Sequence, residues 1–298
     1  MDKKIIVILG PTASGKTKLS IKLAKKFNGE IISADSRQIY KGMDIGTGKI
    51  KKEEMEGIEH HLIDVVSPKK KFSVSVYQKL ALKAIKKIHK KNKIPIIVGG
   101  SGFYIQSVID GINFPKVAPD STLRKKLEEK NTKELHQILK NLDKNRAKNI
   151  DKNNRHRLIR AIEIAKKLGK VPPIERKPLP YPVLILGIKK SKKELKKLIK
   201  NRLLKRLKEG MIEEVKNLHK KGISWKKLEE FGLEYRFIAY YLQKKMEYKE
   251  MLEKLNKAIE HYAKRQMTWF KNQNWRKINW IKNYKEAEEL VKKFLQLT

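Results

Sequence analysis

A glycine-rich octapeptide near the start of the chain constrains the fold more than any other stretch. Residues 10–17 read GPTASGKT, the phosphate-binding loop pattern of Gly, four residues and Gly-Lys-Thr. The apolar run at residues 4–9 suits a buried parallel strand, and apolar residues recur at helical spacing over residues 17–27. This order of strand, loop and helix predicts backbone N–H groups that bind phosphate oxygens.

The loop residues divide the work of holding a diphosphate or nucleotide. We expect the Lys16 ammonium to reach the terminal phosphates and the Thr17 hydroxyl to ligate Mg²⁺. The alternative is a simple glycine-rich turn before a helix. The expected diphosphate or nucleotide site comprises Gly10, Pro11, Thr12, Ala13, Ser14, Gly15, Lys16 and Thr17.

Length and composition bound the remaining possibilities. A chain of 298 residues can form one large domain or two smaller ones. It contains no cysteine, which excludes disulfides and thiolate metal sites and suits a reducing cytosol. No apolar run has the length of a membrane span, and the first residues run directly into a strand. We therefore expect a soluble cytoplasmic protein that does not contact a membrane.

The net charge of +40, from 72 basic and 32 acidic residues, favours a polyanionic partner such as nucleic acid. A general drift toward lysine is the alternative, because only 12 of the basic residues are arginine. Where lysine is the default cation, an arginine is more informative. Six arginines lie in stretches that matter below: Arg37, Arg155, Arg157, Arg160, Arg236 and Arg265.

Polar residues gather after the second predicted strand, at residues 30–32. Residues 33–49 read SADSRQIYKGMDIGTGK. Ligands of open α/β sheets bind beyond the carboxyl ends of strands, so Asp35, Ser36, Arg37 and Gln38 should lie over the same crevice as the phosphate loop. Asp35 could be a base, a magnesium ligand or a helix cap.

Two further strands are predicted at residues 60–66 and 94–98. The adjacent histidines of HHLIDVV would face opposite sides of a strand, so a zinc site there is disfavoured. The second strand is followed by GGSGFYI, where glycines allow close backbone approach to a ligand. Ser101 in this loop either donates a hydrogen bond into the crevice or caps a helix.

Strand-like runs stop at Pro115 and return at residues 184–188, after a proline-rich connector. The sequence therefore predicts an α/β fold with a P-loop NTPase-like parallel sheet core. This core comprises residues 1–114 and 183–298 with C-terminal helices, and residues 115–182 form an all-helical insertion domain. In the insertion, Arg157 and Arg160 could seat phosphates or be ordinary solvated side chains.

Aromatic residues alternate with cations near the end of the chain, at Trp269, Trp275 and Trp280. This pattern suits stacking on unpaired bases. Trp and Phe at helical spacing are more often core residues, which we expect of Trp269 and Phe270.

Six motifs together carry a resemblance to a known family. In order, they are GPTASGKT, ADSRQIYKGMDIGTGK, VGGSGFYI, NNRHRLIRAIE, FGLEYR and RQMTWFK. At these distances they closely resemble the tRNA dimethylallyltransferases, also called tRNA isopentenyltransferases or the IPP transferase family. The likeness extends from Ile5 to about Trp280, and the DSRQ and QMTWF runs separate it from kinases.

The resemblance implies transfer of the dimethylallyl group of dimethylallyl diphosphate to the exocyclic amine of the adenine 3′ of the anticodon in tRNA, with Mg²⁺ as cofactor. It makes Asp35 a general base and Ser101 a catalytic hydroxyl that positions the amine or the phosphate. Arg236 becomes a second clamp on the diphosphate. We expect a monomer that binds the tRNA anticodon stem-loop through Asp35, Ser36, Arg37, Gln38, Ser101, Arg124, His156, Arg157 and Arg160.

The chain departs from the family pattern at Ser101, where threonine is usual, and at His156, where glutamine is more common. Lys271 replaces an arginine, and Lys70 stands where an acidic residue is common. A lysine does not reproduce the planar fork of arginine. Three other functions compete: an ATP-dependent small-molecule kinase, a prenyltransferase acting on free adenine nucleotides, and a non-enzymatic RNA-binding module with a regulatory nucleotide site.

Overall fold

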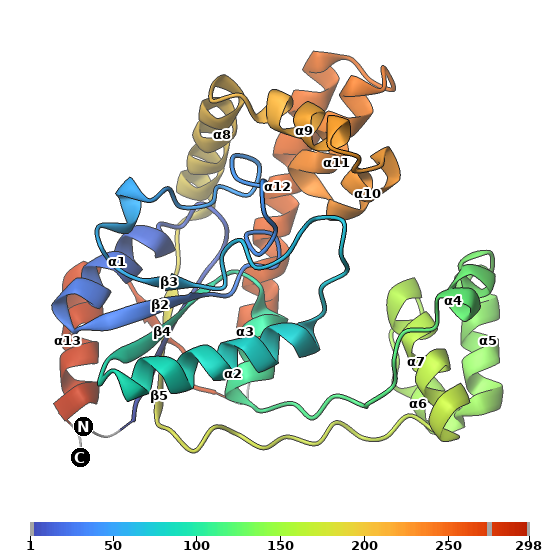
Figure 1. The fold of residues 1–298 in the computed structure, drawn as a ribbon, viewed down its shortest axis with the longest axis horizontal. Helices are drawn as coiled ribbons and strands as arrows, with labels where there is room; N and C mark the ends of the chain where they lie inside the picture. The colour runs from blue at the N-terminus through green and yellow to red at the C-terminus, as the bar shows by residue number, and fades with distance from the viewer. Residues whose placement is uncertain (1–2, 273–275, 297–298) are drawn as a thin grey trace. The chain divides into compact units, whose positions relative to one another are not determined.

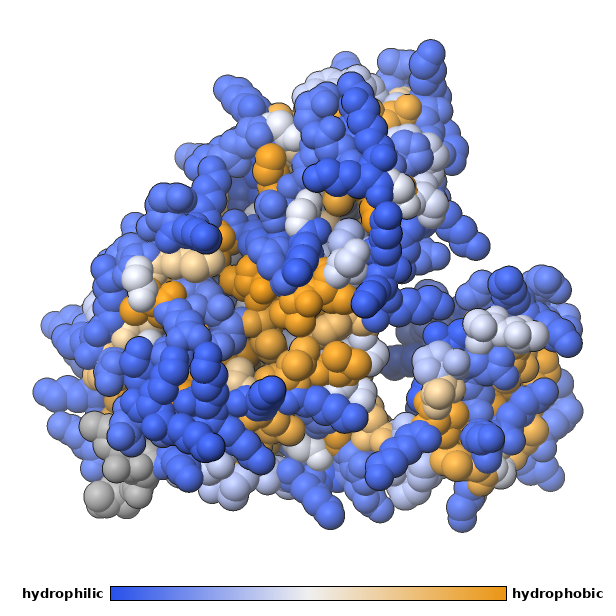
Figure 2. Space-filling model, in the orientation of Figure 1, coloured by the Kyte–Doolittle hydropathy of each residue, from blue (hydrophilic) through white to orange (hydrophobic). Residues whose placement is uncertain are grey.

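The protein is described here by a computed structural model covering residues 3–272 and 276–296. The chain divides into two compact units, Met1–Gly111 with Pro178–Thr298, and Ile112–Lys177 (Figure 1). Hydrophilic side chains dominate the face drawn in Figure 2, as the large net charge predicts. Among the described helices, none is both long and apolar enough to cross a membrane.

A parallel sheet forms the centre of the first unit. Within the described residues it has six strands in the order β3-β2-β4-β1-β5-β6, all paired in parallel. The predicted α/β class is therefore confirmed. The strands are β1 (Ile5–Leu9), β2 (Gly29–Ser33), β3 (His60–His61), β4 (Ile94–Gly99), β5 (Val183–Ile188) and β6 (Asn279–Ile281).

Helices cover both faces of this sheet, which is why its central strands are apolar throughout. On one face, Ile6 and Ile8 of β1 pack with α1 (Lys16–Lys26) and α13 (Tyr284–Gln296). On the opposite face, Val7 packs with α2 (Val74–Lys90) and α3 (Gly102–Ile109). Alternate residues of one strand therefore belong to two different cores.

The strand predicted at residues 60–66 is much shorter in the structure and ends at His61. Leu62 and Asp64 adopt left-handed backbone conformations, with φ of 64° and 54°, which an extended strand does not allow. The chain turns there, and the Asp64 carboxylate pairs with the Lys49 ammonium at 2.6 Å.

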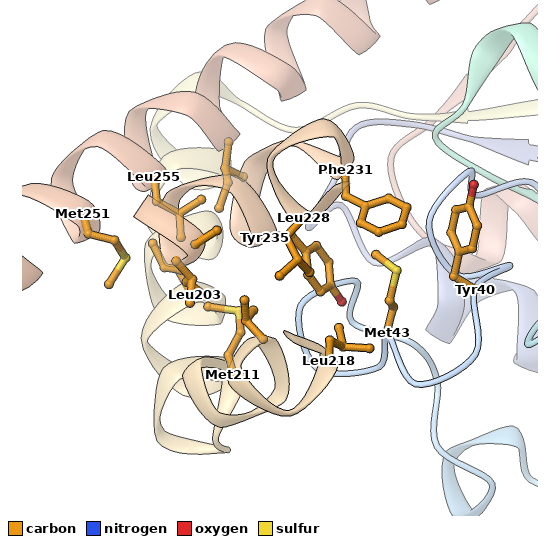
Figure 3. Close-up of a cluster of buried hydrophobic side chains, with 14 of the residues drawn as sticks. Tyr40, Met43, Leu203, Met211, Leu218, Leu228, Phe231, Tyr235, Met251 and Leu255 are labelled. Carbon is orange, nitrogen blue, oxygen red and sulfur yellow. The ribbon is translucent and has the colours of Figure 1, made fainter. Parts of the chain in front are cut away.

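A group of C-terminal helices packs on the segment that follows β2. These helices are α8 (Lys192–Lys208), α9 (Met211–Lys220), α10 (Trp225–Phe231), α11 (Leu233–Leu242) and α12 (Tyr248–Lys271). Their apolar faces enclose Tyr40 and Met43 of the segment after β2 (Figure 3). Phe270 of α12 is buried in the core beneath the sheet, as predicted, and Trp269 packs against the same core. Trp275 lies outside the described residues.

The second unit is built from helices around its own small core. They are α4 (Ser121–Glu128), α5 (Thr132–Leu142), α6 (Lys144–Lys148) and α7 (Arg155–Leu168). Asp120, Asn131, Asp143 and Asn154 cap them through side-chain oxygens. The core is apolar and is contributed mainly by residues Leu127, Leu135, Leu139, Leu158 and Ile162.

Candidate functional site

The phosphate loop lies between β1 and α1, as the sequence predicts. Gly15 has a φ of 91°, a left-handed conformation that favours glycine, and Lys16 begins α1 directly after it. The Lys16 ammonium donates to the carbonyl oxygens of Gly10 at 2.9 Å and Pro11 at 2.6 Å. The loop therefore wraps around its own lysine.

Desolvation, aided by the neighbouring Arg202 guanidinium and opposed by the Asp35 carboxylate, lowers the pKa of the Lys16 ammonium to about 7. An anion bound beside Lys16 should stabilise its charged form, because the anion compensates for the hydration that burial removes.

Arg202 of α8 is a second cation at this loop, and the sequence reasoning missed it. Its guanidinium donates to the Thr12 hydroxyl. Burial, aided by the positive charge of Arg206, lowers the pKa of the Arg202 guanidinium to about 10. The Glu234 and Asp35 carboxylates oppose this shift. The signal was available, because Arg202 is one of the few arginines in a lysine-rich helix. Two cations from segments far apart in sequence thus converge on one loop.

A cavity of about 480 Å³ opens beside these cations within the first unit. Its polar wall comes from the phosphate loop, the carboxyl ends of the strands and helices α8 and α12. Asp35, Gln38, Lys16, Thr17 and Arg202 all line it. Its apolar wall is contributed by Ile31, Ile50, Ile63, Val98 and Leu198.

Asp35 lies in the turn after β2 and caps that turn. Its Oδ1 accepts the backbone N–H groups of Arg37 at 2.8 Å and Gln38 at 3.3 Å. The Ser101 hydroxyl accepts the N–H of Ser36 at 3.0 Å. Oδ1 therefore caps a turn and not the helix that was the alternative for Asp35, while Oδ2 takes no part in these bonds. Asp35, Ser36 and Ser101 are brought together, and of the three Asp35 lines the cavity.

The side chains of Arg37 and Gln38 are already engaged. The Arg37 guanidinium lies 5.6 Å from the ring centroid of Phe231. Gln38 donates from Nε2 to the carbonyl oxygen of Gly48 at 3.2 Å, and its Oε1 accepts from the Ser33 hydroxyl at 3.3 Å. Gln38 therefore fixes the cavity wall.

Gln266 of α12 joins the two glycine loops. Its Oε1 accepts the N–H of Thr12 at 2.8 Å, and its Nε2 donates to the carbonyl oxygen of Gly100 at 3.0 Å. The RQMTWFK motif was visible in the sequence, but nothing local indicated this contact. In the structure Gln266 lies on the buried face of α12, among the apolar residues Ala263 and Phe270.

Arg236 is not brought to the cavity. Its side chain is exposed, and its Nε donates to the carbonyl oxygen of Glu229 at 3.0 Å. It lies on the outer side of α11, whereas Glu234 and Tyr235 of the same motif point inward and are buried. Arg202, and not Arg236, lines the cavity together with Lys16.

Glu30, Glu59 and His61 form a cluster whose potential ligand atoms lie within 4.8 Å of one another, so it could hold a metal ion. Burial opposes ionisation of the Glu30 carboxylate, but hydrogen bonds from Lys91, His61 and Lys93 outweigh it and hold its pKa at about 2. These two lysines already neutralise the cluster. Oxygen donors suited to Mg²⁺ are found instead at the cavity, on Thr17 and Asp35.

The predicted RNA contacts of the second unit fall into two groups. Arg124 binds the buried Glu163 carboxylate through two bonds of 2.7 and 2.6 Å, and Arg160 donates to it at 3.2 Å. Arg124 therefore holds α4 against α7, whereas Arg160 lies on the same helix as Glu163 and also donates to the carbonyl oxygen of Val117. By contrast, His156 and Arg157 are exposed at the start of α7.

Comparison with known proteins assigns the family. The sequence profile of the IPP transferase family matches residues 38–273. The chain belongs to this family. It is 41% identical to tRNA dimethylallyltransferase 1 of Geotalea uraniireducens over 98% of each chain. The resemblance inferred from the six motifs is thus confirmed.

Solved structures agree. The full-length tRNA isopentenylpyrophosphate transferase of Bacillus halodurans superposes with a TM-score of 0.73 at 36% identity, covering 99% of this chain and 96% of that one. A eukaryotic dimethylallyltransferase, crystallised in a study of its action on tRNA, gives a TM-score of 0.76 at 28% identity. The match covers 90% of this chain and 70% of the eukaryotic one.

Proposed function

We propose that this IPP transferase moves the dimethylallyl group of dimethylallyl diphosphate onto the exocyclic amine of the adenine 3′ of the anticodon in tRNA, releasing diphosphate. The observation that carries the proposal is the cavity itself. Two cations, Lys16 and Arg202, and the carboxylate of Asp35 all line it. Such a cavity suits a reaction between an anionic leaving group and a nucleophile that must lose a proton.

At the anionic end, Lys16 and Arg202 would bind the diphosphate together with the backbone N–H groups of the loop. Ser14 supports this assignment, because its buried hydroxyl lacks a hydrogen-bond partner in the described residues, and a phosphate oxygen would supply one. Thr17 would hold Mg²⁺ in the cavity that Asp35 also lines. When bound, Mg²⁺ adds positive charge beside the departing diphosphate.

The apolar wall explains why the donor would carry a short hydrocarbon. Ile31 in the middle of β2 and Val98 near the end of β4 present branched side chains to the cavity, and Ile50, Ile63 and Leu198 extend that surface. A five-carbon prenyl group gains by leaving water here, whereas the ribose of a nucleotide would leave hydroxyls unpaired against it. This favours a prenyl diphosphate over ATP as the ligand.

In the same cavity, Asp35 would accept the proton that the adenine amine loses. A new C–N bond forms at the carbon bearing the diphosphate, the C–O bond breaks, and its electron pair leaves with the diphosphate. Oδ1 is fixed by the turn, so Oδ2 is the oxygen we assign to the proton. Ser101 would position the turn that carries Asp35, because its hydroxyl accepts the N–H of Ser36.

The adenine must leave the stacked anticodon loop to enter such a cavity. Ser36, Arg37 and Gln38 lie beside Asp35 and would contact the flipped base and its neighbours. In the second unit, the exposed His156 and Arg157 would contact the RNA backbone directly, while Arg124 and Arg160 would act by shaping the helices. We assign the reaction to a cytoplasmic monomer.

The test is incubation of the protein with unmodified anticodon stem-loop RNA, Mg²⁺ and dimethylallyl diphosphate, followed by mass measurement of the RNA. A gain of one dimethylallyl group on the adenine 3′ of the anticodon is the expected result. Parallel reactions contain labelled ATP with small acceptors, or free adenine nucleotides with the prenyl donor. Phosphoryl transfer that needs no RNA, or prenylation of nucleotides alone, would refute the proposal.

A further inference from the structure

The loop from Asp44 to Gly48 is held in place by a carboxylate from α9. Glu214 Oε2 accepts the backbone N–H groups of Asp44 at 2.8 Å and Ile45 at 2.6 Å, and Oε1 accepts that of Gly46 at 3.0 Å. Successive N–H groups that converge in this way form an anion-binding nest. Here the anion is a side chain of the same protein, 168 to 170 residues away in sequence.

Tyr235 of α11 binds the same carboxylate. We call Glu214, with its hydrogen bonds to the loop and to Tyr235, the clamp. The Tyr235 hydroxyl donates to Glu214 Oε1 at 2.8 Å. Burial raises the pKa of this hydroxyl and the Glu214 carboxylate raises it further, so Tyr235 remains a donor. A Cβ placed on Gly46 would lie 2.8 Å from the Tyr235 ring, so only glycine fits between ring and loop. Figure 3 shows the ring reaching from α11 toward the loop that carries Met43.

A buried ion pair supports the loop from a second side. Arg206 of α8 donates from Nη1 to the carbonyl oxygen of Gly46 and to the Glu234 carboxylate, each at 3.3 Å. A Cβ on Gly48 would lie 1.5 Å from the Arg206 guanidinium. The glycines of the loop are therefore matched to side chains from three different helices.

This loop forms part of the cavity of about 480 Å³ that also contains Lys16 and Asp35 in its wall, which we call the donor cavity. Thr47 and Gly48 line the cavity wall. The Gly48 carbonyl oxygen accepts from Gln38 Nε2 at 3.2 Å, and the Gln38 backbone N–H donates to Asp35 Oδ1 at 3.3 Å. A continuous series of hydrogen bonds thus leads from α9 through the loop to the turn that carries Asp35.

We propose that Glu214 is a positioning residue for the donor cavity. By binding three consecutive backbone N–H groups, it fixes the wall at Thr47 and Gly48 and, through Gln38, the orientation of Asp35. The expected effect of Glu214 on diphosphate binding does not depend on which reaction the protein catalyses. The expected effect of Glu214 on turnover, through the orientation of Asp35, rests on the proposed prenyl transfer.

Replacement of Glu214 by glutamine tests the clamp with little change in volume. The new amide NH₂ faces groups that also donate, so at least one N–H of the loop loses its acceptor. We expect Glu214→Gln to raise the Kd for magnesium pyrophosphate and the KM for dimethylallyl diphosphate roughly tenfold and to lower kcat, because a charge-assisted bond is lost. The KM for tRNA should not change. Tyr235→Phe removes one bond of the four, so its effect should be about threefold.

Glu213→Gln is the matched control. It makes the same chemical change at the adjacent position, where the side chain is exposed and lies 3.6 Å from Lys216, and it should leave every constant unchanged. The measurements are titration calorimetry with magnesium pyrophosphate, steady-state kinetics for each substrate, and thermal melting.

A lower melting temperature in Glu214→Gln, with the pyrophosphate Kd and both kinetic constants equal to the wild-type values, would overturn the proposal, because Glu214 would then be merely structural. Should Glu214→Gln fail to fold, Tyr235→Phe decides, and an unchanged pyrophosphate Kd in that variant refutes the clamp. Should the wild-type protein bind pyrophosphate but transfer no prenyl group, the proposed function fails while the pyrophosphate comparison still judges Glu214.

Discussion

Diphosphate binding should be coupled to uptake of a proton by Lys16. In the ligand-free protein, desolvation and the neighbouring Arg202 lower the pKa of this ammonium to about 7. A bound diphosphate places negative charge beside Lys16 and favours the protonated form. Above about pH 7 the free lysine is mostly neutral and the bound lysine is charged, so binding takes up a proton and affinity falls as pH rises.

The magnitude follows from that pKa. For uptake of one proton, the apparent Kd is multiplied by one plus the ratio of neutral to charged Lys16 in the free protein. Between about pH 7 and about pH 9 this factor rises roughly fiftyfold, which corresponds to about 2.3 kcal/mol. The unliganded protein should show the opposite trend in stability, because the unfolded chain retains a proton that the folded site has lost.

Titration calorimetry with magnesium pyrophosphate across this range, in HEPES and in Tris, measures both quantities. The apparent Kd gives the pH dependence, and the difference in heat between the buffers counts the protons. Lys16→Met should bind weakly and with a nearly flat pH dependence, whereas Lys18→Met, at an exposed position one residue from the site, should behave as wild type. A flat wild-type profile with no buffer dependence of the heat would refute the reasoning.

Three further outcomes are expected. Asp35→Ala should abolish prenyl transfer while tRNA binding persists in a filter-binding assay; turnover within about tenfold of wild type would exclude it as the base. Arg202→Gln should raise the Kd for pyrophosphate roughly tenfold to a hundredfold by calorimetry, since a cation is lost from the anion site, and an unchanged Kd would contradict this. Arg157→Gln should reduce the salt dependence of tRNA binding by about one counterion. Arg160→Gln should mainly lower the melting temperature, because Arg160 pairs with the buried Glu163. Equal salt slopes for the two variants would contradict this distinction.

Local patterns predicted the phosphate loop and its surroundings well. GPTASGKT places Lys16 and Thr17 by covalent connection alone, so strand, loop and helix required no tertiary information. The turn at Asp35 was equally accessible, because the carboxyl ends of neighbouring parallel strands meet at one edge of a sheet. That rule brought Asp35 and Ser101 to the same place.

The rest of the site could not be read from local patterns, because it comes from helix faces that pack against the loop. Arg202 and Gln266 lie on α8 and α12, and their spacing alone does not say which face meets the cavity. The same ambiguity misplaced Arg236, since the inward positions of α11 belong to Glu234 and Tyr235. Arg160 was ambiguous until its carboxylate partner on the same helix, Glu163, proved to be buried.

The bridge made by Gln266 has a consequence for synthesis. Gln266 lies 254 residues after Thr12 of the phosphate loop, so a ribosome must add all of those residues before Gln266 can join the two glycine loops. An early fragment can form its first strands and helix. The phosphate loop and the Gly100 loop are joined by Gln266 only after α12 has packed against them. Activity should therefore begin abruptly, late in translation, rather than grow as the chain emerges.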